Sequence, residues 1–172
     1  MKSSITTKRG DDGTTDLLKG GRQEKIHPVF DALGDLDELT AALGLCRLYA
    51  VPEENHGILQ IQKELSLLSG ALAGGTLTFG RGQINRIETE LKKLEESVPP
   101  VTEFVFPGDN PRSAHFHFAR SICRRAERSI LKYFRMEQQS TGDIYSVYLN
   151  RLSDLLFLMA EKDSPEGHGR SE

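Results

Sequence analysis

Three arginines at helical spacing are the side chains of this chain best suited to chemistry. Arg120, Arg124 and Arg128 stand four residues apart, so an α-helix would stack their guanidinium groups in a ladder. Glu127 lies beside the middle rung. Like charges at this spacing slightly destabilise an isolated helix, so folding alone gives little reason for them. Planar donors that stay charged suit a polyanion such as a nucleotide triphosphate, and the ladder therefore predicts an anion site.

The ladder also has a plainer interpretation, as the solvated face of an amphipathic helix whose arginines pair with nearby carboxylates. In an isolated repeat of this kind, that structural role is the commoner one. His115 and His117 predict no metal site, because a spacing of two residues does not place them on one face of a helix. The choice between the two interpretations depends on what the rest of the chain supplies.

A glycine-rich segment near the start of the chain supplies a second candidate for anion binding. Gly10 would let backbone N–H groups converge on an anion, and the hydroxyl of Thr15 adds a donor. Lys8 and Lys25 carry positive charge in the same segment. The segment lacks the Gly-Lys-Ser/Thr of a Walker A motif, and a segment of this kind taken by itself is more often a flexible terminus than a phosphate site.

Composition places the chain among ordinary globular domains and excludes several classes. Its 172 residues fit one domain, with 27% charged and 37% hydrophobic residues. A net charge of -3 argues against a general nucleic-acid partner. No signal-peptide core and no apolar run of about 18 residues is evident, so we expect a cytoplasmic protein without a membrane partner. Cys46 and Cys123 fit no metal or redox spacing, and this favours buried, reduced thiols over the alternative of a disulfide between them.

The elements that must position the ladder read as helices. Asp35 is expected to cap the first helix, with Glu38 at its capping-box position and Pro52 as its stop. Asn110 and Pro111 read as the N-cap and first residue of the helix that carries the ladder. Apolar residues at helical spacing predict the remaining helices over about 53–73, 82–96, 111–136 and 143–162.

The predicted fold class is all-α. A single domain over residues 1–162 would consist of an irregular glycine-rich loop over 1–30 and a five-helix bundle over 33–162. Neither a strand pair nor an internal repeat is expected. The polar tail over 163–172 is expected to be disordered. A loop of this length in a compact domain is usually functional or disordered, so its glycines and threonines favour a ligand role.

Taken together, these segments resemble one family, the PduO-type ATP:cob(I)alamin adenosyltransferases, also called corrinoid adenosyltransferases. The resemblance covers about Thr6–Glu161 and rests on four blocks in matching order: Thr7–Thr15 with Lys25, Gly34–Leu39, Phe104–Gly108 followed by Ala119–Arg128, and Tyr148–Phe157. It implies a homotrimer of five-helix bundles with sites between subunits. It also implies transfer of the 5′-deoxyadenosyl group of ATP to the cobalt of cob(I)alamin, with release of triphosphate.

The resemblance assigns roles residue by residue. It implies an ATP site of Thr7, Lys8, Arg9, Gly10, Thr15, Asp16, Lys25, Arg124, Arg125, Glu127, Arg128 and Asn150. It implies a corrinoid site of Phe104, Asp37 and Arg120, in which Phe104 lies under the corrin ring and Arg120 pairs with Asp37. The catalytic set would be Phe104, Asp37, Arg120 and Arg124. Mg²⁺ would be held mainly through the ATP phosphates and not by a protein metal site.

The chemistry of the implied reaction accounts for these residue types. Cob(I)alamin is a strong nucleophile, so the protein must align the 5′ carbon with cobalt and stabilise charge on the leaving triphosphate. An apolar wedge that excludes the lower axial ligand, assigned to Phe104, would ease reduction of Co(II). A flavin-dependent reductase and an adenosylcobalamin-dependent acceptor enzyme are the further partners that the resemblance implies.

Two residues depart from the family's pattern. Asp35 stands where Thr is usual and places an extra carboxylate near Asp37, and Asp109 stands where a second Gly is usual.

Two other functions compete with the transferase. One is a non-catalytic nucleotide- or corrinoid-binding bundle that acts as a chaperone or sensor. The other is a structural bundle that oligomerises through its apolar stripes.

Overall fold

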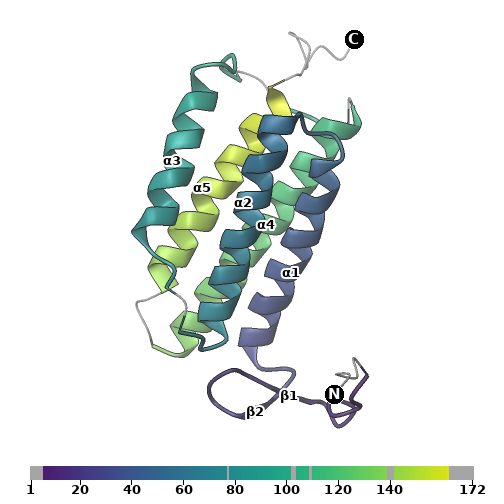
Figure 1. Cartoon of the computed structure of the whole chain (residues 1–172), viewed down its shortest axis with the longest axis vertical. Helices are drawn as coiled ribbons and strands as arrows, with labels where there is room; N and C mark the ends of the chain where they lie inside the picture. The colour runs from purple at the N-terminus through teal and green to yellow at the C-terminus, as the bar shows by residue number, and fades with distance from the viewer. Residues whose placement is uncertain (1–5, 77, 102–103, 109, 139–141, 163–172) are drawn as a thin grey trace.

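The computed structural model describes residues 6–76, 78–101, 104–108, 110–138 and 142–162, so Asp109 and the tail over 163–172 lie outside the described residues. The described chain contains β1 (Thr14–Asp16), β2 (Arg22–Glu24), α1 (Pro28–Arg47), α2 (Pro52–Leu72), α3 (Arg81–Glu95), α4 (Pro111–Met136) and α5 (Gly142–Glu161). Figure 1 shows the helices side by side along one axis, with the two strands beyond the end of the bundle. The all-α prediction is confirmed.

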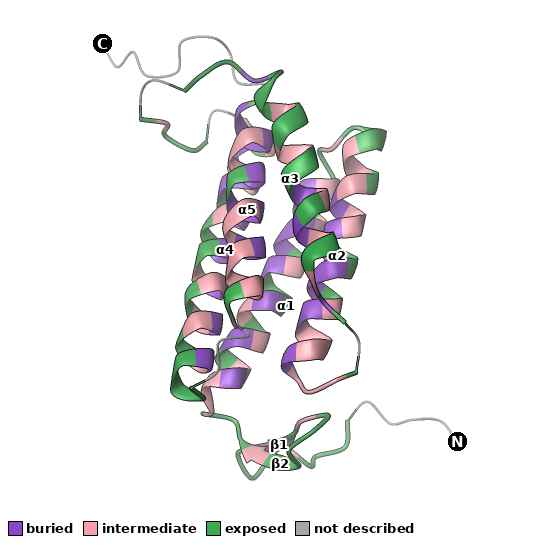
Figure 2. Cartoon of the chain, turned by 90° about the vertical axis from the view of Figure 1, so that its left-hand side faces the viewer, coloured by how far each residue is buried: buried purple, intermediate pink, exposed green. Residues whose placement is uncertain are grey.

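The helix α4 occupies the middle of the bundle. It packs most extensively against α5 on one side and α1 on the other, while α2 packs on α1 and α3 on α5. Figure 2 shows that the buried faces of the helices point inward and the exposed faces outward. Each helix contributes fully buried side chains to one continuous core, among them Leu36, Leu65, Ile87, Phe116 and Leu152. Burying one such side chain stabilises the fold by about 1.5–3 kcal/mol.

The first helix begins at Pro28, so the prediction that Asp35 caps it is wrong. His27 is the N-cap, and its Nδ1 accepts a hydrogen bond from the backbone N–H of Val29 at 3.3 Å. Pro28 then fits the first helical position, where no N–H is needed. Gly34 and Asp35 lie inside the helix, because burial of its apolar face outweighs the roughly 1 kcal/mol that a helical glycine costs.

The remaining helix predictions are confirmed, since α2, α3, α4 and α5 start and end within one residue of the expected ranges. The cap of α4 is also confirmed. The side chain of Asn110 accepts a hydrogen bond from the backbone N–H of Ser113 at 2.8 Å, and Pro111 follows it. Local signals decided these elements, because caps and apolar periodicity act over a few residues.

The expectation of no strand pair is wrong. Strands β1 and β2 form an antiparallel hairpin in which Thr15 lies opposite Gln23. Gly20 and Gly21 make the turn with φ values of +107° and +71°, a region that favours glycine. The backbone N–H of Lys19 donates to the carbonyl of Ala73 at 3.2 Å and joins the hairpin to the end of α2. Three-residue polar strands carry no apolar alternation, which is why the sequence pattern does not reveal them.

A buried polar network ties α3 into the bundle. Glu64 of α2 is only 2% exposed and accepts two hydrogen bonds from the Arg86 guanidinium, at 2.5 and 2.6 Å. The hydroxyl of Tyr148 of α5 donates to the same carboxylate at 2.8 Å. Burial, followed by the Glu64 charge, raises the pKa of Tyr148 well above its usual value, so this hydroxyl keeps its proton and donates.

We expect Glu64→Ala to lower the free energy of unfolding by about 3 kcal/mol, because it leaves the Arg86 charge and the Tyr148 hydroxyl without their acceptor. Urea denaturation of the purified protein measures this. The control is Glu90→Ala, which removes an exposed ion pair with Lys93 at 3.0 Å and should cost less than about 1 kcal/mol. Equal losses in the two variants would contradict a stabilising role for the network.

Candidate functional site

The arginine ladder lies where α4 meets α5. Arg124 and Arg128 are exposed, and Arg120 is half-buried. The Arg120 guanidinium lies 5.7 Å from the ring centroid of Phe157 on α5. The charges of Arg124, Glu127 and Asp154 all act on Cys123 between the two helices. We call this surface the arginine face; by these contacts and by helical spacing it comprises Arg120, Arg124, Glu127 and Arg128 of α4 and Asn150, Asp154 and Phe157 of α5. It brings together four of the predicted ATP residues with Arg120.

Charges on the arginine face surround a buried thiol. Burial raises the pKa of Cys123, the negative charge of Glu127 raises it further, Arg124 lowers it, and Asp154 raises it. The Cys123 thiol donates to the carbonyl of Leu149 at 3.2 Å. Cys123 is therefore a protonated packing residue below the ladder, as predicted, and Cys46 is likewise buried and free. Asp154 belongs to this surface, although the sequence reasoning gave it no role.

Arg125 is not part of the arginine face. Its Nε donates to Asp35 of α1 at 2.8 Å, and its Nη2 contacts the carboxylate of Glu38. The hydroxyl of Ser129 donates to the other oxygen of Asp35 at 2.5 Å. The hydrogen bond with Asp35 is the main cause that raises the pKa of Arg125. The structure therefore separates Arg125 from its predicted ATP neighbours, and Asp35 joins α1 to α4 instead of capping a helix.

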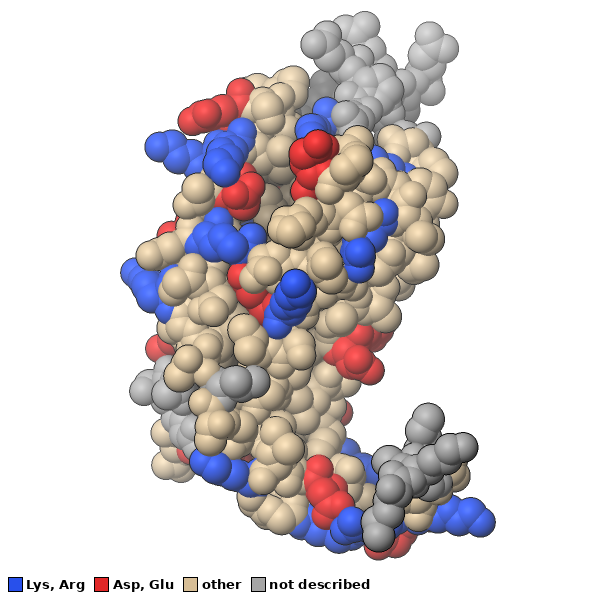
Figure 3. Space-filling model, viewed as in Figure 1, with Lys and Arg blue, Asp and Glu red and all other residues tan. Residues whose placement is uncertain are grey.

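The N-terminal loop, residues 7–25, is held together by its own polar side chains. The Arg22 guanidinium donates to both carboxylate oxygens of Asp12, at 2.9 and 3.1 Å, and also contacts the carbonyl of Arg9. Arg9 itself pairs with Asp16 at 3.1 Å. Figure 3 shows positive and negative side chains mixed at the hairpin end of the molecule. Asp12 and Arg22 organise the loop, and no local pattern singled them out.

A close approach explains one glycine of the loop. The Lys25 ammonium donates to the carbonyl of Gly10 at 2.7 Å, and a Cβ added at Gly10 would lie 2.9 Å from Lys25 Nζ. Lys8 has φ of +58°, a left-handed conformation that is uncommon outside glycine. Strained backbone of this kind is frequent at ligand sites. The bond between Lys25 and Gly10 brings the two ends of the loop together, so the predicted ATP residues of the loop lie in one compact segment.

The loop and the ladder are separate within one chain. The loop continues into His27, whose ring lies 6.0 Å from that of Tyr133 near the end of α4. Among the described residues, no hydrogen bond or ion pair links residues 7–25 to Arg120, Arg124 or Arg128. An anion that contacts both groups must bridge the space between them or use the loop of another copy.

The expected pair of Arg120 with Asp37 is not formed within one chain. Asp37 lies exposed on α1 and lines a hollow of about 480 Å³ between α1 and α2. Arg120 lies on the other side of α4, against α5, and its buried Nε has no hydrogen-bond partner in the described structure. The two groups therefore occupy different sides of the packed α1–α4 pair. Pairing them requires a second copy of the chain.

Phe104 and Phe106 form an exposed aromatic pair in the segment between α3 and α4. They are 76% and 74% exposed, and their ring centroids lie 5.1 Å apart. Large apolar side chains held in water without a covering surface indicate an interaction site. This exposure fits the predicted contact of Phe104 with a large apolar ligand, and it excludes a place for Phe104 in the core of one chain.

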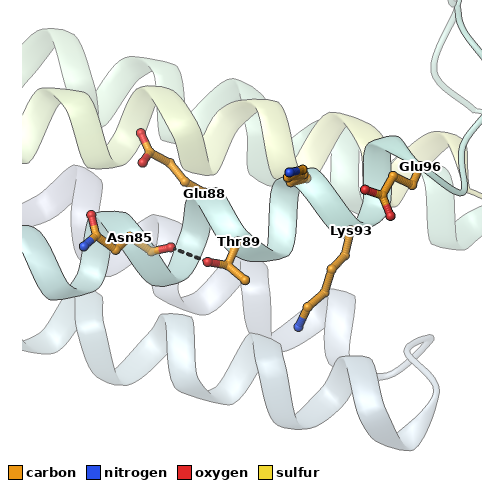
Figure 4. A pocket seen from close by; sticks show the side chains of 6 residues that line it. Asn85, Glu88, Thr89, Lys93 and Glu96 are labelled. Atoms are coloured by element: carbon orange, nitrogen blue, oxygen red, sulfur yellow. Dashed lines mark hydrogen bonds between the residues drawn. The ribbon is translucent and has the colours of Figure 1, made fainter.

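A further hollow of about 400 Å³ lies on the outer surface of α3 and shares no residue with this site. It is lined by Asn85, Glu88, Thr89, Lys92, Lys93 and Glu96 (Figure 4). The Thr89 hydroxyl donates to the carbonyl of Asn85, a bond within the helix.

In the part of the chain that the structure describes, no group of three or more His, Cys, Asp or Glu could hold a metal ion. None of the described helices has the length and apolarity needed to cross a membrane.

Solved structures with this architecture define the class. A Phe-to-Ala variant of the PduO-type ATP:corrinoid adenosyltransferase from Lactobacillus reuteri, complexed with cobalamin and ATP, has a TM-score of 0.83 and 27% identity, covering 92% of both chains. An Arg-to-Lys variant complexed with ATP has a TM-score of 0.81 and 28% identity, covering 91% of this chain and 92% of the other. The fold is that of PduO-type adenosyltransferases.

The family follows from the sequence comparison. The family model described as cobalamin adenosyltransferase matches residues 5–162, and the chain belongs to this family. It is 34% identical to the corrinoid adenosyltransferase PduO of Salmonella typhimurium, over 96% of this chain and 51% of that protein. It is 35% identical to the cobalamin adenosyltransferase of Cupriavidus metallidurans, over 97% and 91%. The chain thus spans about half the length of the Salmonella protein and most of the Cupriavidus one.

A pH titration tests the organisation of the loop. Hydrogen bonds from the Thr14 hydroxyl and N–H, with Arg22 nearby, lower the pKa of Asp12 from 3.8 to about 2. Because the folded pKa is depressed, the carboxylate stabilises the loop fully above pH 3.8, and this stabilisation is lost as the pH falls through about 2. We expect the Asp12 carboxyl resonance to titrate at about 2 by NMR and to move toward 3.8 in Thr14→Val. An identical titration in the variant would contradict the hydrogen bond as its cause.

Proposed function

We propose that this protein transfers the 5′-deoxyadenosyl group of ATP to the cobalt of reduced cob(I)alamin or a related corrinoid. The Co(I) electron pair would form the Co–C bond while the bond from the 5′ carbon to oxygen breaks, and triphosphate would leave with that electron pair. The products are adenosylcobalamin and triphosphate. The single observation that carries the proposal is the arginine face with its exposed ladder, in a chain that the family model matches over residues 5–162.

The ladder supplies the anion-binding part of the proposed site. Arg124 and Arg128 are exposed, and within the described residues neither forms a hydrogen bond or an ion pair. Their donors are therefore available to the triphosphate, whose growing charge they would stabilise during transfer. Glu127 and Asn150 lie on the same face and would contact the nucleotide. The loop residues Thr7, Lys8, Gly10, Thr15 and Lys25 would wrap the phosphates, with Arg9 and Asp16 shaping the loop through their ion pair.

The corrinoid part of the proposed site combines two copies of the chain. Arg120 of one copy would pair with Asp37 of the next, because the two groups face different sides of one bundle. Such a head-to-tail contact closes into a ring, and three copies give the homotrimer that the resemblance implies. Phe104, exposed beside Phe106, would lie under the corrin ring and exclude a lower axial ligand.

The proposed reaction needs Mg²⁺, a reductant and an acceptor. Mg²⁺ would be held mainly through the ATP phosphates, because it keeps most of its waters and requires few protein ligands. A flavin-dependent reductase would produce Co(I), and an adenosylcobalamin-dependent enzyme would take the product. The buried free thiols of Cys46 and Cys123 suit a reducing compartment, and a cytoplasmic location remains part of the proposal.

An anaerobic assay tests the proposed function directly. The protein is mixed with chemically reduced cob(I)alamin and Mg·ATP, and the corrinoid spectrum is followed together with release of triphosphate. We expect loss of the Co(I) spectrum that depends on ATP and matches triphosphate in amount. Binding of ATP or corrinoid without this turnover would favour the chaperone or sensor, and no binding of either would leave a structural bundle.

Within that assay, Arg124→Ala is expected to raise the KM for ATP about ten- to hundredfold, because a hydrogen bond to a charged group contributes about 1.5–3 kcal/mol. Arg135→Ala is the matched control, since Arg135 is exposed on the same helix outside the ladder. It should change the KM for ATP by less than about twofold. Equal effects of the two substitutions would contradict a specific phosphate site at the ladder.

Mixed assemblies test whether Asp37 and Arg120 come from different copies. Asp37→Ala and Arg120→Ala are each expected to lose corrinoid-dependent turnover. When the two variants are co-expressed and purified as mixed trimers, random assembly places an intact Asp37 opposite an intact Arg120 in about one quarter of the interfaces. Activity should therefore return to about one quarter of the native level. Mixed trimers with no recovered activity would show that one chain supplies both groups.

A further inference from the structure

His117 and Glu161 form a buried polar pair one turn of α4 before the ladder. The proposed reaction assigns this pair no role. The Nε2 atom of His117 on α4 lies 2.9 Å from a carboxylate oxygen of Glu161 at the end of α5. The two residues are only 5% and 7% exposed. Breaking such a pair by removing one partner is strongly destabilising, while an apolar pair of similar size often folds equally well. Folding alone therefore does not explain why polar groups occupy this position.

The pair continues through ring contacts to the arginine face. The His117 ring meets Phe157 edge to face, with ring centroids 5.8 Å apart and planes at 65°. Phe157 in turn lies 5.7 Å from the Arg120 guanidinium. The spacings are three residues from His117 to Arg120 and four from Phe157 to Glu161, so each helix presents its two residues on one side. The four side chains form a continuous series: Glu161, His117, Phe157, Arg120.

We propose that His117 and Glu161 are positioning residues that fix Phe157 and, through it, Arg120 in the corrinoid part of the site. This inference rests on the proposed function. The buried Nε of Arg120 has no hydrogen-bond partner in the described structure, so within one chain the aromatic face of Phe157 is what orients the guanidinium. The edge of the His117 ring limits the tilt of Phe157, and the bond to Glu161 fixes the plane of that ring.

A purely structural role is the competing explanation, because the pair also holds the last turn of α5. The chain supplies a matched control for it. Arg112 of α4 donates to the carbonyl of Met159 at 2.6 Å and to Glu54 of α2 at 3.1 Å. Glu54 also accepts from Lys162 at 2.8 Å. This second set of contacts holds the same turn of α5, and the ring contacts given for Phe157 among the described residues are with His117 and Arg120.

The test compares three variants in the cob(I)alamin assay. The double variant His117→Phe/Glu161→Leu keeps a ring against Phe157 but removes the hydrogen bond, and its apolar pair is compatible with folding. It should raise the KM for cob(I)alamin about tenfold and that for ATP by less than about twofold. The conservative variant Glu161→Gln, whose amide oxygen still accepts from the imidazole, should keep the native KM for cob(I)alamin. Glu54→Gln should lower Tm and leave both KM values unchanged.

An unchanged KM for cob(I)alamin in the double variant, or an equal rise in both KM values, would overturn the inference. A second readout does not depend on turnover. The Nε–H resonance of Arg120, assigned by its loss in Arg120→Lys, reports the ring of Phe157. Its chemical shift should change in the double variant and remain at the native value in Glu54→Gln. An unchanged chemical shift in the double variant overturns the positioning role. A native protein that does not consume cob(I)alamin would refute the proposed function alone, because the resonance would still test the positioning.

Discussion

The packing of α4 between α1 and α5 is the constraint on which the rest of the structure depends. Because α1 and α5 pack on α4, its side chains are divided between two helix interfaces, the core and the exposed surface. Arg120 is directed to Phe157 of α5, and Arg125 is directed to Asp35 of α1. A rotation of α4 by one residue, about 100°, would exchange these assignments. The buried apolar face of α4 prevents that rotation, so the hydrophobic core also sets the chemistry of the surface.

Polar contacts between the helices refine this arrangement. Asp35 joins α1 to α4 through Arg125, and Glu64 joins α2 to α3 and α5. Contacts of this kind contribute less to stability than the apolar core, but they fix register, because a buried carboxylate without its partner is costly. The arginine face gains from this rigidity: exposed guanidinium groups on a fixed helix lose less entropy on binding an anion than the same groups on a mobile loop.

The proposed site is incomplete within one chain, because its parts lie on different sides of one bundle. The N-terminal loop lies at the hairpin end of the bundle (Figure 1). The ladder runs along α4, and Asp37 lines the hollow between α1 and α2. A single bundle buries its own apolar faces and leaves these polar groups outward on different sides. Their combination by an adjoining copy would make a cleft that is open for ligand entry and shielded once assembled, which favours charge stabilisation in a water-poor site.

The sequence by itself determined the helices from Pro52 onward, the cap at Asn110 and the ladder, because periodicity and capping act between residues less than two turns apart. The early start of α1, the pairing of β1 with β2 and the partner of Asp35 were decided only by tertiary structure. Asp35 meets Arg125 across 90 residues of sequence, the hairpin bonds to the end of α2 through Lys19, and the first turns of α1 form because their apolar side chains are buried in the core. The same holds for His117 and Glu161, 44 residues apart in sequence and joined only once α4 packs on α5.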